Sequence, residues 1–404
     1  MQPFESDNPT PMPIGSADAV ALLTALLRFD TTSSRSNLQC LHWIAEYARP
    51  YGPAVRFTYN EDASKANLLL SFGPMTEGGI VLSAHSDTVP VAGQPWTVPP
   101  FEATARDGRI HGRGACDMKG FIAACLAAMP AWHAAELQRP IHLALSYDEE
   151  LGCLGVPRLV DDFAAHMPAP AVVWVGEPTD MRIATSHKGV CVFQTRFFGR
   201  DAHSSMPSLG HSAIADAVRF AGRLLDLGLE IAERTTAVPG LLPPHTTLNI
   251  GRIDGGTALN MVARCCSLDW EFRAIPEEDV QALKRRIEQF LAAHPAAVEA
   301  PDAPAPPDAG SVHHDARMFV PPLDPGTNRP ALAALRRVLG DKAEIAVPFG
   351  TEAGYFQQRG WPAVVCGPGS IEQAHQPDEW VEVAQLEECT RALQSLPAFL
   401  ARND

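Results

Sequence analysis

The chain has 404 residues, of which 46% are hydrophobic and 20% are charged, and these proportions exclude a disordered or fibrous protein. Its 32 basic and 47 acidic residues give a formal net charge of -15, which opposes binding to a phosphate backbone and excludes nucleic acid as an expected partner. Because a single core usually stops growing at ~250–300 residues, we expect two domains.

The nine cysteines form no CxxC pair and no regular framework, which is typical of reduced thiols in a cytosolic protein. The N-terminal segment, Met1 to Gly15, is polar and lacks the basic and apolar regions of a signal peptide. No stretch reaches the ~18 consecutive apolar residues of a membrane span. We therefore expect a cytoplasmic protein with no membrane partner.

The first and last parts of the chain alternate short apolar runs with amphipathic segments. A helix capped by Ser16 is expected first, and a second helix is expected over residues 121–132. This alternation predicts an α/β fold with a mostly parallel central sheet flanked by helices. Its buried strands are expected at residues 80–83, 141–145, 171–175 and 363–365.

The middle of the chain follows a different order, β-α-β-β-α-β, which is typical of a ferredoxin-like α+β domain. We therefore expect an inserted domain over residues 183–321, between the two parts of the main domain at 1–182 and 322–404. A Pro/Ala-rich stretch at 295–309 is assigned to a surface loop of the insert. Its strands are expected at 190–197, 246–253, 265–272 and 316–320, and its helices at 212–227 and around 280–291.

Each of the four buried strands of the main domain ends at a polar cluster. In open α/β sheets, ligands bind beyond the carboxyl ends of the strands, so these side chains are expected to meet in one crevice. The clusters contain, in strand order, His85 and Asp87, then Glu149 and Glu150, then Glu177, and finally His375 after a Gly-Pro-Gly loop.

A fifth polar cluster contains Asp117, which stands at the start of the expected helix, within the segment Gly112-Arg113-Gly114-Ala115-Cys116-Asp117. An Asp in this position is often only an N-cap. The glycines favour a different role, because a carboxylate that bridges two ions needs backbone packed closely around it.

These residues together indicate a site for two divalent metal ions. Taken alone, His85 could be a core histidine satisfied by a neighbour, and Glu149 with Glu150 could be a solvated strand end. Two histidines and several carboxylates, however, match zinc, with cobalt or manganese as alternatives. Two such ions could activate a shared water, and Glu149 would move its proton.

The sequence closely resembles the dinuclear zinc aminoacylase/carboxypeptidase superfamily, and within it the acetylornithine deacetylase family, over nearly its full length. The resemblance rests on the combination of motifs more than on any one of them. They are His85-Ser86-Asp87-Thr88-Val89-Pro90, Asp117-Met118-Lys119-Gly120, Glu149-Glu150, Gly176-Glu177-Pro178-Thr179, His187-Lys188-Gly189, Gly350-Thr351-Glu352-Ala353, Cys366-Gly367-Pro368-Gly369 and Ala374-His375.

The resemblance implies a role for each of these site residues. Asp117 would bridge the two ions, His85 and Glu177 would bind one ion, and Glu150 and His375 would bind the other. Asp87 would support His85, and Glu149 would act as general acid and base.

The resemblance also assigns roles in the inserted domain, which would serve as a lid and form a homodimer. His203 would steady the oxyanion in the active site of the partner subunit. Asn260 and Arg273 would hold the substrate carboxylate, with Thr351 near them. As an alternative, Arg273 could only form a surface ion pair with Glu271 or Glu277.

The expected reaction is hydrolysis of a small N-acyl amino acid, and N-acetyl-L-ornithine is the first choice of substrate. With this substrate the reaction would belong to arginine biosynthesis. Succinyl-diaminopimelate, another N-acyl amino acid or a dipeptide is the alternative within the same enzyme class. A metal-binding protein without catalysis and a two-metal phosphatase are alternatives from other classes. Glu149 disfavours the binding protein, because it is needed for chemistry and not for holding metal.

Overall fold

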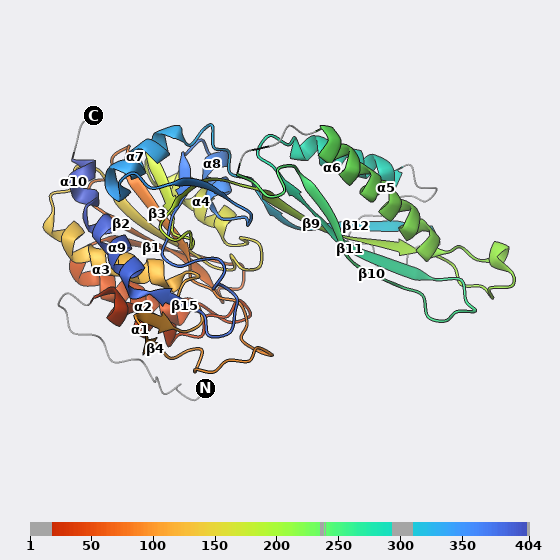
Figure 1. The fold of residues 1–404 in the computed structure, drawn as a ribbon, viewed down its shortest axis with the longest axis horizontal. Helices are drawn as coiled ribbons and strands as arrows, with labels where there is room; N and C mark the ends of the chain where they lie inside the picture. The colour runs from red at the N-terminus through yellow and green to blue at the C-terminus, as the bar shows by residue number, and fades with distance from the viewer. Residues whose placement is uncertain (1–17, 235–237, 239, 293–309, 402–404) are drawn as a thin grey trace. The chain divides into compact units, whose positions relative to one another are not determined.

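The computed structural model describes residues 18–234, 238, 240–292 and 310–401, which form two compact units (Figure 1). The first unit extends to Thr185 and resumes over Pro325–Ile345 and from Thr351 onward. The second unit comprises Ser186–Asp324 and the short segment Ala346–Gly350. The N-terminal segment Met1 to Gly15 and the Pro/Ala-rich stretch at 295–309 lie outside the described residues.

An eight-stranded sheet forms the centre of the first unit, in the order β1-β2-β6-β3-β7-β14-β8-β13. The four middle strands β6, β3, β7 and β14 are parallel, whereas β2 pairs with β6, and β8 with β14, in antiparallel fashion. The mostly parallel character of its centre confirms the predicted fold class. The strands are β1 (Ala54–Tyr59), β2 (Ala66–Phe72), β3 (Ile80–His85), β6 (Ile141–Ser146), β7 (Val172–Val175), β8 (Ile183–His187), β13 (Glu344–Val347) and β14 (Ala363–Val365).

Every residue of β2, β3, β6, β7 and β14 is buried, as expected for strands that are covered on both faces. Helices supply this cover: α3 packs with α1 and α9, and α4 packs against β1 and β6 (Figure 1). The helices are α1 (Ala19–Leu27), α2 (Leu38–Ala48), α3 (Lys119–Ala134), α4 (Val156–His166), α7 (Arg329–Leu339), α8 (Ala353–Gln358), α9 (Val383–Gln394) and α10 (Leu396–Leu400).

The first helix begins later than the sequence predicted. α1 starts at Ala19, and its N-cap is Asp18, whose Oδ1 accepts a hydrogen bond of 2.8 Å from the Ala21 amide. The prediction of a cap at Ser16 is therefore wrong. Ser and Asp are both favoured cap residues, and Ser16 itself lies outside the described residues.

The first unit also contains a separate, small three-stranded sheet. Its order is β15-β5-β4, with β4 (Thr104–Arg106), β5 (Arg109–His111) and β15 (Trp380–Glu382). The antiparallel pairing of β5 with β15 joins the segment before Asp117 to the segment after His375. Two loops that are far apart in the chain are thereby held together.

The second unit has the predicted β-α-β-β-α-β order. Its antiparallel sheet, β10-β11-β9-β12, carries α5 and α6, which share a hydrophobic core with β9 and β11. Burial alternates along β9 and β11, because one face of the sheet packs on the helices. The elements are β9 (Gly189–Phe198), α5 (Ala213–Arg234), β10 (Thr247–Gly255), β11 (Cys265–Ala274), α6 (Val280–Ala292) and β12 (Val312–Val320).

Across the part of the chain that the structure describes, no helix combines the length and the apolar character that crossing a membrane requires.

Candidate metal centre

The side chains of the candidate site follow the four parallel strands at the centre of the main sheet. His85 is the last residue of β3, and Glu177 comes two residues after β7. Glu149 and Glu150 follow β6, and the loop after β14 leads to His375. Because β6, β3, β7 and β14 are neighbours, their carboxyl ends present these residues at one edge of the sheet.

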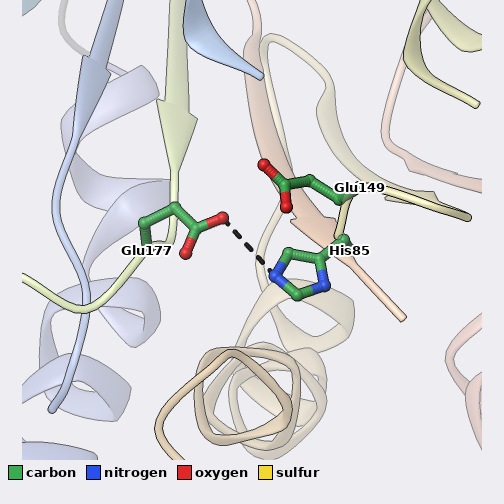
Figure 2. A group of neighbouring side chains, drawn as sticks. All are labelled: His85, Glu149 and Glu177. Atoms are coloured by element: carbon green, nitrogen blue, oxygen red, sulfur yellow. Dashed lines mark ion pairs between the residues drawn. The ribbon is translucent and has the colours of Figure 1, made fainter. Parts of the chain in front are cut away.

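The buried His85 side chain faces two carboxylates. Its Nε2 lies 2.8 Å from Asp117 Oδ1 and 3.5 Å from Glu177 Oε1. Figure 2 shows the imidazole pointing toward Glu177, with the Glu149 carboxylate beside them. Ligand atoms of His85, Glu149 and Glu177 all lie within 4.8 Å of one another, as do those of His85, Asp117 and Glu150.

Asp117 lies between the two histidines. Its Oδ1 faces His85, and its Oδ2 lies 3.1 Å from His375 Nε2, which is also 3.0 Å from Glu150 Oε2. Asp117 is not an N-cap, because α3 begins at Lys119 and no side chain caps it. The structure thus brings together all five residues for which the sequence predicted metal binding.

Asp87 supports this cluster in two ways. His85 Nδ1 lies 3.0 Å from the backbone carbonyl of Asp87 and 3.6 Å from its carboxylate, so the carbonyl is the closer acceptor. The carboxylate accepts hydrogen bonds from Ser33 Oγ at 2.7 Å and from the amides of Glu149 and Glu150 at 3.0 and 3.3 Å. It therefore also fixes the turn that follows β6, a role that the sequence did not reveal.

The carboxylates of the cluster repel one another when no cation is present. Burial, together with the charge of Asp117, raises the pKa of Glu177 well above its usual value and that of Glu150 to about 6. Hydrogen bonds with Asp117 and Glu150 raise the pKa of His375 to about 10. Burial alone would lower the pKa of His85. The negative charges of Glu177 and Asp117 have the larger combined effect and raise this pKa well above its usual value. The cluster therefore favours positive charge beside its carboxylates.

The donor set fits divalent cations. Glu150 Oε1 is buried and has no hydrogen-bond partner among the described residues, which leaves a carboxylate oxygen to be satisfied by an ion. Two imidazoles and three or more carboxylates are the ligands that zinc and similar ions take. His375 is 47% exposed, so one side of the cluster is open to solvent.

Glu149 lies beside the cluster, with ligand atoms of His85 and Glu177 within 4.8 Å of its carboxylate. Burial and the neighbouring Glu150 and Asp117 raise its pKa to about 8, against the opposing effect of His85. The thiol of Cys153 donates a hydrogen bond of 3.3 Å to Glu149 Oε1. A carboxyl group with a pKa near neutrality can both accept and return a proton.

Sequence reasoning missed three residues around the site. Cys153 contacts Glu149, as described above. Glu352, fully buried, accepts hydrogen bonds from Ser83 within β3 and from Ser146 at the end of β6. Glu379 binds the loop that carries Asp117. Only the resemblance, through the Gly-Thr-Glu-Ala motif at 350–353, could have indicated Glu352.

The remaining predicted residues are divided between the two units. Thr351 is buried in the first unit, where its hydroxyl accepts a hydrogen bond of 3.2 Å from the Ala353 amide. His203 and Asn260 are exposed in the second unit. Arg273 forms an ion pair of 2.9 Å with Glu271, the alternative that the sequence had left open. The relation of these second-unit residues to the cluster stays a prediction.

A parallel sheet whose strand ends gather histidines and carboxylates, together with a ferredoxin-like second unit, defines the class of metal-dependent hydrolases. The family model described as "Peptidase family M20/M25/M40" matches residues 81–398. The chain therefore belongs to the M20/M25/M40 peptidase family.

Individual relatives agree with this assignment. An acetylornithine deacetylase from Myxococcus xanthus is 36% identical over 384 residues, which cover 92% of this chain and 95% of the relative. An M20 family metallo-carboxypeptidase from Sulfolobus solfataricus superposes with a TM-score of 0.75 at 17% identity, covering 95% and 99% of the two chains. A dinuclear metal-binding M20 peptidase from Bacillus subtilis gives a TM-score of 0.64 at 14% identity, covering 94% and 96%.

Proposed function

We propose that this hydrolase cleaves the amide bond of a small N-acyl amino acid and that N-acetyl-L-ornithine is its substrate. The proposal is supported by the 36% identity to an acetylornithine deacetylase, which extends over nearly all of both chains. The products would be L-ornithine and acetate, which would place the reaction in arginine biosynthesis.

The observation that carries the proposal is the position of the Asp117 carboxylate, with one oxygen 2.8 Å from His85 and the other 3.1 Å from His375. We assign Asp117 as the bridge between two divalent ions, zinc first, with cobalt or manganese as alternatives. His85 and Glu177 would hold one ion, and Glu150 and His375 the other. Two bound ions would lower the pKa of a water molecule and polarise the acyl carbonyl of the substrate.

Glu149 is assigned as the general base and acid. Its carboxylate takes a proton from the attacking water, whose oxygen adds to the acyl carbon. When the carbon–nitrogen bond breaks, Glu149 returns the proton to the leaving amine. Cys153 orients Oε1 of this carboxylate, and the hydrogen bonds that the Glu149 and Glu150 amides donate to Asp87 hold the turn in place.

The second unit would supply groups that contact the substrate. His203 Nδ1 accepts a hydrogen bond of 3.2 Å from the Ser205 amide, which leaves Nε2 as the ring nitrogen that would donate to an oxyanion. Asn260, Arg273 and Thr351 are the candidates for the substrate carboxylate. To bind the substrate carboxylate, Arg273 would have to break its ion pair with Glu271.

We further propose a cytoplasmic homodimer joined through the second unit. All nine cysteines are unpaired, which suits a reducing compartment. β10 is an edge strand of its sheet, and Val218, Leu225 and Leu229 of α5 are more than half exposed. An open strand edge beside an apolar helix face is typical of a surface that pairs with a second copy.

A substrate panel tests the proposal. The purified protein would be stripped of metal with a chelator, reloaded with Zn²⁺ or Co²⁺, and assayed on N-acetyl-L-ornithine, N-succinyl-diaminopimelate, other N-acetyl amino acids and a dipeptide. We expect the highest kcat/KM on N-acetyl-L-ornithine. Equal or better activity on N-succinyl-diaminopimelate would reject the substrate assignment, and bound metal without turnover of any amide would reject the enzyme assignment.

A further inference from the structure

A buried ion pair joins the two loops that carry Asp117 and His375. Arg113 Nη1 lies 2.6 Å from Glu379 Oε2, and both side chains are 1% exposed. Removing one member of such a pair leaves the other charge buried without compensation, which is strongly unfavourable. The pair lies at the junction where β5, just before Arg113, pairs with β15, just after Glu379.

The Glu379 carboxylate binds the backbone of the Asp117 loop at three points. Its Oε2 accepts from the Gly114 amide at 3.0 Å, and its Oε1 accepts from the amides of Cys116 and Asp117 at 2.9 and 3.1 Å. Gly114 has a φ of +83°, a conformation that favours glycine, and the loop turns sharply there. Glu379 thus fixes the peptide from which the Asp117 side chain extends toward both histidines.

The Arg113 guanidinium reaches the other loop. Its Nη2 donates to Gln94 Oε1 at 2.5 Å, and Gln94 Nε2 donates to the His375 carbonyl at 2.8 Å. His375 has a φ of +63°, a strained backbone conformation for a residue with a side chain. Such a conformation persists when its surroundings hold it. Two hydrogen bonds stabilise this conformation. Gln94 donates to the carbonyl of His375, and Arg113 donates to the carbonyl of Gln376 at 3.4 Å.

We propose that Glu379, Arg113 and Gln94 are positioning residues that set the distance between Asp117 and His375, and so build the site of the ion between them. None of the three provides a ligand atom to the cluster. The inference rests on the proposed function only in taking Asp117 and His375 as metal ligands. Groups that orient metal ligands in this way typically contribute ~10–100-fold to metal affinity.

Cobalt binding tests the proposal without an activity assay. The metal-free protein would be titrated with Co²⁺, and the visible absorption spectrum would report the number, affinity and coordination of the ions. We expect the Glu379→Gln and Gln94→Ala variants to bind the second Co²⁺ ~10–100-fold more weakly, with an altered spectrum. Gln94 is only half-buried, so its variant remains informative if Glu379→Gln fails to fold.

Asp162→Asn is the matched control. The carboxylate of Asp162, on α4, forms a bidentate ion pair of 2.6 Å with Arg56, on β1. Neither residue is one of the assigned metal ligands. This variant should lose stability and keep wild-type cobalt binding. Wild-type protein that fails to bind two ions would reject the proposed metal centre itself. Wild-type cobalt affinity and spectrum in either Gln94→Ala or a folded Glu379→Gln would overturn the positioning role.

Discussion

Glu149 is the residue on which the proposed chemistry depends most directly. A carboxylate oxygen of Glu149 lies within 4.8 Å of ligand atoms of His85 and Glu177. Glu149 is nevertheless not one of the five residues assigned as metal ligands. We expect Glu149→Gln to lower kcat by ~100–10,000-fold, the range of general acid–base catalysis, while two metal ions stay bound. Steady-state kinetics with metal analysis measures both effects, and Glu46→Gln, in an exposed ion pair with Arg49, is the control. Near-normal turnover in Glu149→Gln would contradict the assigned role.

A second prediction concerns His142, a buried histidine of β6 that lies away from the cluster's ligands. Its Nδ1 is 2.8 Å from Ser71 Oγ, and burial lowers its pKa from 6.5 to about 4. Between these two values the unfolded chain binds a proton that the native protein does not. The free energy of unfolding must therefore fall as the pH drops from 6.5 toward 4, by about 2 kcal/mol at pH 5.

Urea denaturation of wild-type protein and His142→Asn at pH 7 and pH 5 measures this contribution. The wild type should lose about 2 kcal/mol more than the variant over this interval, because the variant has no imidazole to protonate. Equal losses in the two proteins would show that His142 is not buried in its neutral form.

At the scale of elements, close packing between β7, α3 and the loop after β14 positions Glu177. A Cβ atom on Gly176 would lie 2.0 Å from the Phe121 ring, and one on Gly367 would lie 2.0 Å from the Gly176 carbonyl. Neither position tolerates a side chain unless the strand end moves. Glycine is thus required at the residue directly before Glu177.

We expect Gly176→Ala to destabilise the protein by ~1–3 kcal/mol through overpacking and to weaken metal binding, because Glu177 must shift with the backbone. Gly222→Ala on α5 is the matched control, since a Cβ there meets nothing within 4 Å and alanine favours a helix. Thermal unfolding and zinc titration compare the two variants. Unchanged zinc affinity in Gly176→Ala would contradict the link between packing and the site.

The four parallel strands could be predicted from sequence because each is a short, mostly apolar run that ends in a polar cluster. The same pattern located His85, Glu150 and Glu177, since parallel strands that are neighbours end at one edge. Glu379 could not be found in this way. Apart from Arg113, its partners are the amides of Gly114, Cys116 and Asp117, which lie 262–265 positions away in the chain and carry no side-chain signal.

The start of α1 shows a different limit of sequence reasoning. Ser16 and Asp18 are both suitable caps, and no local rule chooses between them. The edge strand β1, its neighbour β2, and the short β4, β5 and β15 were also not predicted. Three-residue strands depend on their partners more than on their own sequences.

At the scale of the whole molecule, the proposed homodimer makes a prediction about α5. Val218, Leu225 and Leu229 are 56%, 55% and 66% exposed, and their spacing places them on one face of the helix. We expect the double variant Leu225→Glu/Leu229→Glu to be monomeric, because burying these charges at an interface is unfavourable.

Light scattering coupled to size exclusion measures the mass of each species. Leu242→Glu, at a position that is 81% exposed and not on α5, should remain a dimer. A double variant that keeps twice the mass of one chain would show that the α5 face is not the interface. A monomeric wild type would reject the dimer itself.

The central claim is that Asp117 bridges two divalent ions, one held with His85 and Glu177 and the other with Glu150 and His375. A crystal structure of the zinc-loaded protein, with anomalous scattering recorded at the zinc edge, tests it most directly. The account predicts two anomalous peaks about 3.5–4 Å apart, each within bonding distance of one Asp117 oxygen. A single peak, or two peaks that do not share Asp117, would contradict it.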